Sequence, residues 1–100
     1  MNTKDLKITV IEIRGKCPVY SVGDSFYLKK GFVLTIPENR QICMHSLSSI
    51  MPYHVALSHN VSAREVGLSL TDDHKAILQC LDPCDFTGGG TVILEVEVLS

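Results

Sequence analysis

Two stretches of the chain alternate between apolar and polar side chains, and this alternation constrains the fold more than any other feature. Over residues 91–99 it is unbroken, which predicts a β-strand with one face in a core. Residues 6–14 alternate in the same way until Ile11, where the apolar set changes phase and a slip in strand register is expected. We expect these complementary first and last strands to pair. Their core-facing side chains would be Leu6, Ile8, Val10, Val92, Leu94, Val96 and Val98.

A β-hairpin is predicted between these two strands in the sequence. Residues 25–28 and 32–36 have the composition of short strands, and the Lys-Lys-Gly sequence at residues 29–31 suits the turn that joins them. Pro37 ends this unit because proline has no N–H to donate to a neighbouring strand.

Residues 42–60 are the one region with a clear helical period. Pro52 interrupts it. Because proline lacks an N–H and its ring clashes with the preceding turn, we expect either a kink or two short helices that meet there. Ser48 or Ser49 would cap the second helix. The apolar positions that recur with this period are Met44, Leu47, Ile50, Met51, Val55 and Leu57.

The order of these elements predicts an α+β fold, in which one Pro-kinked helical region packs on one face of a mainly antiparallel sheet. Residues 75–81 would add a strand, residues 82–85 a turn and residues 88–90 a flexible glycine hinge. One hundred residues, 45% hydrophobic and 20% charged, correspond to a single globular domain over residues 1–100. Because the chain has no Trp and few aromatic residues, a surface groove or a site completed by a second subunit is easier to build than an enclosed cavity.

Charge and hydropathy exclude two classes of partner. The nine Lys and Arg residues are scattered and the net charge is −2, so no basic stripe exists for nucleic acid. The N-terminal residues lack the apolar stretch of a signal peptide, and no segment approaches the about 20 apolar residues that cross a membrane. We therefore expect a cytoplasmic protein whose four cysteines are free thiols or metal ligands. A homo-oligomer or a protein partner stays open.

Cys17 and Cys43 stand in settings that suit thiolate chemistry. Cys17 follows Lys16 and lies near Arg14 in a loop just after a strand, and positive neighbours favour a thiolate. Cys43 opens the helical region, where unpaired N–H groups would act in the same way. His45 could share a metal ion with Cys43 only if the helix begins after Cys43. The alternative for both cysteines is packing as small apolar residues.

Cys80 and Cys84 form the sequence C-L-D-P-C at the junction of a strand and a turn. Two loop cysteines at this spacing can reach one metal ion, although C-x-x-C is the commoner zinc spacing. Asp82 and Asp85 would oppose an unneutralised thiolate but would be tolerated beside a cation. With His45, the four cysteines offer enough soft ligands for one tetrahedral zinc or a small iron–sulfur cluster. Two ordinary packed cysteines are the alternative for this pair.

The other residues that could carry chemistry have structural explanations. His54, His59 and His74 suit surface or helix-capping positions, and Asp24 suits a turn between strands. The glycines at residues 88–90 precede a strand rather than a helix and a lysine, so they do not form a phosphate-binding loop.

Several motifs together resemble a family of small uncharacterised proteins of about this length from bacteria and archaea. The resemblance rests on GKCPVY and VGDSF in the first part of the chain, on CMHSL with Pro52-Tyr53, and on CLDP with the segment over residues 88–95. It implies no settled activity. It does imply that Cys17, Cys43, His45 and Cys80 belong to the recognisable pattern, whereas Cys84 does not.

The leading hypothesis from the sequence is a small metal- or iron–sulfur-binding accessory or redox protein. Cys17, Cys43 and Cys80 would be thiolate ligands, with His45 or Cys84 as the fourth. One alternative is a thiol-based enzyme with Cys17 or Cys43 as nucleophile and His45 as base. Another is a binding module for a small ligand or a protein, in which the cysteines are only packed.

Overall fold

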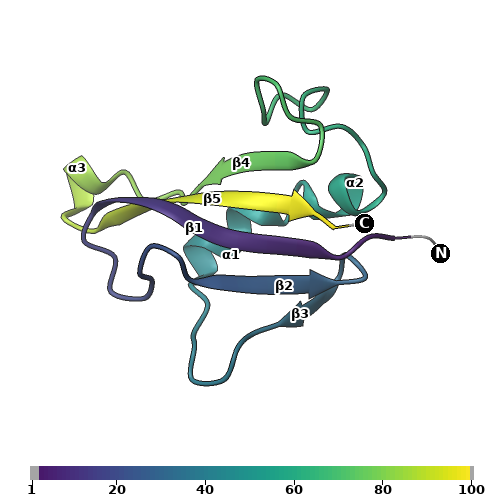
Figure 1. The fold of residues 1–100 in the computed structure, drawn as a ribbon. Coiled ribbons are helices and arrows are strands. Elements are labelled where there is room, and N and C mark those ends of the chain that lie inside the picture. Colours follow the sequence, from purple (N-terminus) through teal and green to yellow (C-terminus); the bar gives the residue numbers. More distant parts are fainter. Residues whose placement is uncertain (1–2, 100) are drawn as a thin grey trace.

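The computed structural model describes residues 3–99 and contains one five-stranded antiparallel sheet with the strand order β3-β2-β1-β5-β4 (Figure 1). The α+β class predicted from the sequence is confirmed, although the sheet dominates and the helices are short. The elements are β1 (Leu6–Gly15), β2 (Ser25–Lys29), β3 (Val33–Thr35), α1 (Met44–Ile50), α2 (His54–Ser58), β4 (Lys75–Gln79), α3 (Cys84–Thr87) and β5 (Gly90–Val98).

The first and last strands pair, as expected, and together they form the centre of the sheet. β1 and β5 pair antiparallel from Leu6 opposite Val98 to Gly15 opposite Gly90. The register shifts between Val10 and Glu12, which is the slip expected at Ile11. Ile11 is left exposed by this bulge, while the alternating apolar residues before it point into the core.

The core lies on one face of the sheet, and α1 and α2 cover that face (Figure 1). Its strand residues come from the alternating positions of β1, β2, β4 and β5, and each of the two helices contributes one fully buried apolar side chain, Ile50 and Leu57. Burial of these apolar side chains is the main stabilising term for a fold of this kind. The core residues with no exposed surface are Leu6, Ile8, Ile50, Leu57, Ala63, Ala76, Leu94 and Val96.

Two short helices meet around Pro52, as expected. The predicted serine cap is wrong, because Tyr53 occupies the N-cap position of α2 and makes no side-chain capping bond. Ser48 and Ser49 instead donate their hydroxyl hydrogens to backbone carbonyls one turn back, at His45 and Ser46. These hydroxyls are engaged inside α1 and cannot serve the next helix.

Two details of the C-terminal part differ from the prediction. Residues 82–85 do not form a simple turn, because a single helical turn, α3, begins at Cys84. Gly90 is not part of a flexible hinge but the first residue of β5, buried and paired with Gly15. Among residues 3–99, no helix is long and apolar enough to cross a membrane.

Candidate functional site

Three of the cysteines and one histidine line a single cavity of about 240 Å³. Cys17 follows β1, Cys43 immediately precedes α1 and Cys80 follows β4, so the cavity lies at the end of the sheet where Gly15 pairs with Gly90. Cys80 is buried, and Cys17 and Cys43 are half-buried. The other residues that line the cavity are Pro18, Val19, Tyr20, His45, Asp82, Gly89, Gly90 and Val92.

The loop that carries Cys17 is held against the start of β5 by close backbone contact. The Lys16 N–H donates to the carbonyl of Gly89 at 3.3 Å. A Cβ on Gly90 would lie 2.6 Å from the backbone nitrogen of Cys17, which is closer than side-chain carbons approach other atoms. Glycine is therefore required here for the two chain segments to meet, and its absence of a side chain fixes one wall of the cavity.

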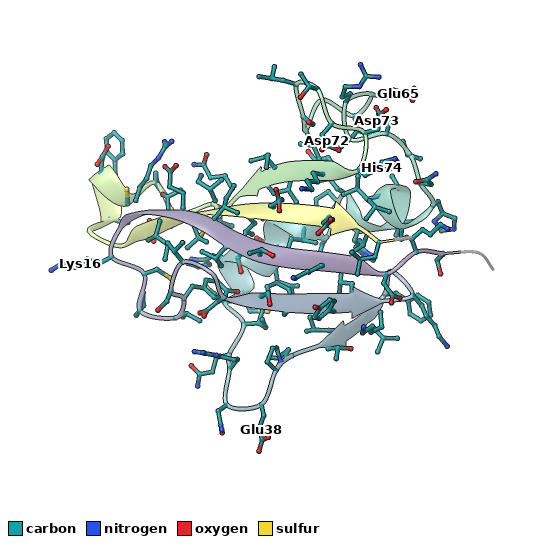
Figure 2. The ribbon with its side chains drawn as sticks, in the orientation of Figure 1. Lys16, Glu38, Glu65, Asp72, Asp73 and His74 are labelled. Carbon is teal, nitrogen blue, oxygen red and sulfur yellow. The ribbon has the colours of Figure 1, made fainter. Side chains whose placement is uncertain are left out.

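The sulfur of Cys17 accepts a hydrogen bond from the backbone N–H of Tyr20 at 3.4 Å. From the sequence, we expect the positive charge of Lys16 or Arg14 to lie near this sulfur and to favour its thiolate. However, Lys16 projects away from the sheet at the edge of the molecule (Figure 2), and Arg14 forms an ion pair with Glu12 at 2.7 Å. The group that the structure places at the Cys17 sulfur is thus a backbone N–H rather than a lysine or arginine.

Cys43 is fixed by a closed set of hydrogen bonds around the Tyr20 hydroxyl. The Cys43 N–H donates to the Tyr20 oxygen at 3.0 Å, and that oxygen lies 2.6 Å from the Ser46 oxygen. Ser46 in turn donates to the carbonyl of Cys43 at 2.7 Å. Because the Ser46 hydroxyl hydrogen is used in that bond, the Tyr20 hydroxyl donates to Ser46. Burial raises the pKa of Tyr20, which keeps the phenol protonated. Sequence reasoning missed this role of Tyr20, although the residue belongs to the motif that contains Cys17.

His45 could share a site with Cys43 only if the helix began after Cys43, and the structure meets this condition. Cys43 is the N-cap of α1 with extended backbone angles, so the helix begins after it, and both residues line the same cavity. His45 is exposed and therefore lies toward the solvent side, whereas Cys80 is buried. Asp82 adds a carboxylate to the cavity, held by a hydrogen bond from the Thr87 hydroxyl.

Cys84 is separate from this group. It lines another cavity, of about 170 Å³, together with Arg14, Gln79 and residues of α3. Its Cβ lies close to Gly15, where an added side-chain carbon would approach it within 3.2 Å. Three of the four cysteines therefore share a cavity, and the fourth faces a different one.

The cysteines surround their cavity without converging on one point. Within residues 3–99, no group of three or more His, Cys, Asp or Glu side chains lies close enough together to hold a metal ion in the observed arrangement. A shared ion would therefore require an arrangement of these side chains different from the observed one.

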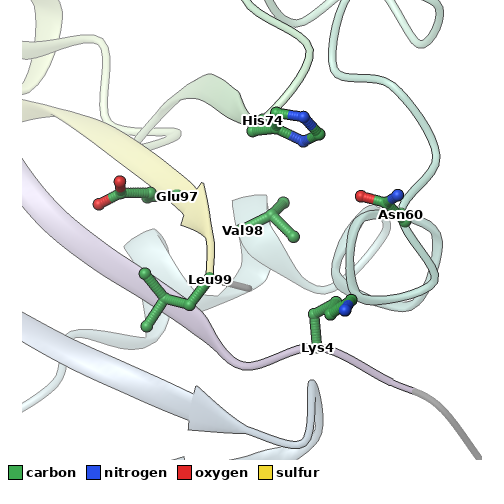
Figure 3. Close-up of a pocket in the computed structure, with 6 residues that line it drawn as sticks. All are labelled: Lys4, Asn60, His74, Glu97, Val98 and Leu99. Atoms are coloured by element: carbon green, nitrogen blue, oxygen red, sulfur yellow. The ribbon is translucent and has the colours of Figure 1, made fainter.

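The remaining histidines have structural partners elsewhere. The Nδ1 atoms of His54 and His59 lie 2.8 Å from the backbone carbonyl oxygens of Gly31 and Val55, respectively. His74 lies with Asn60 and Lys4 at a larger cavity of about 440 Å³ at the opposite end of the sheet (Figure 3). Glu97 also lines it, but its carboxylate points away from these three side chains. No cysteine is among the residues that line this cavity.

Comparison with known proteins gives no match to any family model, any curated protein or any solved structure. The resemblance noted from the sequence motifs therefore carries no function to this chain.

Proposed function

We propose that the protein is a small metal-binding accessory protein that takes up one thiophilic divalent ion, with zinc as the reference metal. The observation that supports this is the presence of Cys17, Cys43 and Cys80 around one cavity, from segments far apart in the sequence. His45 lines the same cavity and would be the fourth ligand. Thiolate and imidazole are the ligands that zinc takes in tetrahedral protein sites.

The charge in the cavity favours a cation over three bare thiolates. Metal binding requires deprotonated thiols and releases their protons. Asp82 places a carboxylate at the same cavity, and it would repel thiolates that no cation neutralises. A divalent ion would compensate both the sulfurs and this carboxylate.

The surroundings of the sulfurs suit ligands that must be held in place. The Tyr20 N–H already points to the Cys17 sulfur, and such N–H donors stabilise a thiolate. The hydrogen bonds around the Tyr20 hydroxyl fix the backbone of Cys43. These contacts hold two of the proposed ligands at the cavity.

The first experiment is zinc titration of metal-free protein, purified without oxygen, against a chromophoric chelator. We expect about one zinc per chain. Cys17→Ser, Cys43→Ser and Cys80→Ser should each weaken binding by more than about 100-fold, because loss of a ligand should exceed the 10–100-fold effect of changes around a site. Iron and sulfide analysis of the same preparation distinguishes a single ion from an iron–sulfur cluster.

Cys84→Ser is the matched control, because it removes a thiol that faces a different cavity. It should bind zinc as the unmodified protein does. Absence of uptake by the unmodified protein, or equal affinity in all four variants, would refute the proposal.

A thiol-based reaction is the second candidate, because two half-buried cysteines and a histidine line the same cavity. Cys17 or Cys43 would be the nucleophile and His45 the base. Alkylation of the metal-free protein at neutral pH, followed by mass spectrometry, tests this. One cysteine that reacts much faster than Cys84, and more slowly in the His45→Gln variant, would support it, whereas four similar rates would exclude it.

A further inference from the structure

The outer strand β3 carries a continuous exposed apolar segment. Residues 32–36 are all exposed, and four of them are large and hydrophobic: Phe32 (59% exposed), Val33 (46%), Leu34 (40%) and Ile36 (39%). No charged residue occurs from Gly31 to Pro37. Natural proteins usually protect a sheet edge with charges, bulges or covering loops, so a bare apolar edge indicates a contact surface.

The opposite edge of the sheet is protected. The outer side of β4 is covered by the segment between α2 and β4, which lies beyond that strand (Figure 1). The Ile77 N–H donates to the carbonyl of Leu68 in this segment at 2.8 Å. Residues 33–36 have no comparable backbone partner on the outer side of β3 among the residues that the structure describes. The two edges therefore differ, and only the β3 edge is free to pair.

The apolar side chains of β3 also extend the core-facing surface of the sheet. Leu34 pairs with Leu28, which is buried, so the two side chains lie on the same face. The helices α1 and α2 lie behind the centre of the sheet and do not reach over β3 (Figure 1). Phe32 and Ile36 flank β3, in the turn before it and in the segment after it, and both are exposed.

We propose that β3 pairs antiparallel with β3 of a second copy of this chain, about a two-fold axis at Leu34. In this register Leu34 faces Leu34 of the second copy and Val33 faces Thr35, while Phe32 and Ile36 flank the paired strands. The two-fold axis also places the turn before β3, with Lys30, at the end of the pairing where the second copy has the turn after β3, with Glu38. A two-fold contact must be self-complementary in this way, and here both the apolar pattern and the charges satisfy the condition.

The charges at the ends of the segment are free to take part. Lys29 is paired with Asp5 at 3.8 Å, but neither Lys30 nor Glu38 forms an ion pair within residues 3–99. Glu38 projects from the loop after β3, away from the body of the sheet (Figure 2). A contact of about seven residues per copy is smaller than the about 800 Å² per partner of a standard interface, so the dimer should be weak and concentration-dependent.

Sedimentation velocity over a concentration series tests the proposal with the full chain. The unmodified protein should shift from monomer to dimer. Leu34→Lys places two like charges face to face at the axis and should weaken the dimer by about tenfold or more. Leu70→Lys is the matched control, because Leu70 is 97% exposed and lies outside the β3 edge. Circular dichroism would verify that both variants are folded.

A charge exchange tests the register itself. Lys30→Glu and Glu38→Lys should each weaken the dimer, and the double variant should restore it. A protein that stays monomeric up to its solubility limit would overturn the proposal, as would a dimer that Leu34→Lys leaves intact. Equal weakening by the Leu70→Lys control would also overturn it.

Discussion

The hydroxyl of Tyr20 joins two parts of the chain that are far apart in the sequence. One oxygen atom accepts the Cys43 N–H and bonds to Ser46, and both of those groups are sheltered from water. Its loss would leave the Cys43 N–H without a partner in the wall of the cavity, while the Ser46 hydroxyl would keep its hydrogen bond to the Cys43 carbonyl. An unsatisfied buried group costs about 1–3 kcal/mol.

We therefore expect Tyr20→Phe to lower the free energy of unfolding by about 1–3 kcal/mol in urea titrations. Tyr27→Phe is the control. The ring of Tyr27 lies beside the Lys29 ammonium at 4.5 Å, and its hydroxyl is outside this network. The control should stay within about 0.5 kcal/mol of the unmodified protein. Equal effects of the two variants would show that the Tyr20 hydrogen bonds contribute no specific stability.

The close contact between Gly90 and the backbone of Cys17 leads to a second prediction at the residue scale. Gly90→Ala places a methyl group 2.6 Å from the Cys17 nitrogen, so the loop after β1 must move. We expect a loss of about 1–3 kcal/mol, typical of an overpacked position, together with faster alkylation of Cys17.

Gly88→Ala is the control for Gly90→Ala, because it introduces backbone strain without a steric contact. Gly88 has φ +74°, but no neighbouring atom lies within 4 Å of the position that an alanine methyl group would take, so alanine there is strained without touching the loop. It should lose stability and leave the alkylation rate of Cys17 unchanged. An unchanged rate in Gly90→Ala as well would mean that the contact does not shield Cys17.

Among the elements, the segment between α2 and β4 depends on Asp73. Ser62 donates to its carboxylate at 2.6 Å and Arg64 at 2.8 Å. These two hydrogen bonds lower the pKa of Asp73 below its ordinary value of 3.8. A lowered pKa in the folded state stabilises the protein above the unfolded-state pKa, and this stability is lost as the pH falls through the folded-state value.

Asp73→Asn should accordingly lower the Tm at neutral pH, and the difference from the unmodified protein should shrink as the pH falls below about 3.8. Because Asp73 is at the surface, the effect should be small and reduced by salt. Glu65→Gln, on the same segment, is the control. A Tm difference that stays constant down to the acid range would contradict the role of the ionised carboxylate.

The strands and the break in the helical region could be predicted because their signals are local. Alternation identified β1 and β5, two adjacent apolar residues marked the bulge at Ile11, and Pro52 marked the end of α1. The site could be predicted only in part. Cys17, Cys43 and Cys80 were candidates, but their shared cavity depends on the strand order, which no local pattern contains. Cys84 was grouped with Cys80 by spacing alone, and the turn of α3 directs it to another cavity.

At the scale of the whole molecule, the central β1–β5 pair has a consequence for the order of folding. Leu6 meets Val98 across nearly the whole chain, whereas the β2–β3 hairpin closes over a few residues. Closing a long loop is entropically costly and slow, so the hairpin can form before the centre of the sheet does. Cys17 and Cys80 are brought to their common cavity only when that last pairing is complete. An ion bound in this cavity would therefore contact the protein only after the transition state for folding. It would leave the folding rate unchanged and would slow unfolding.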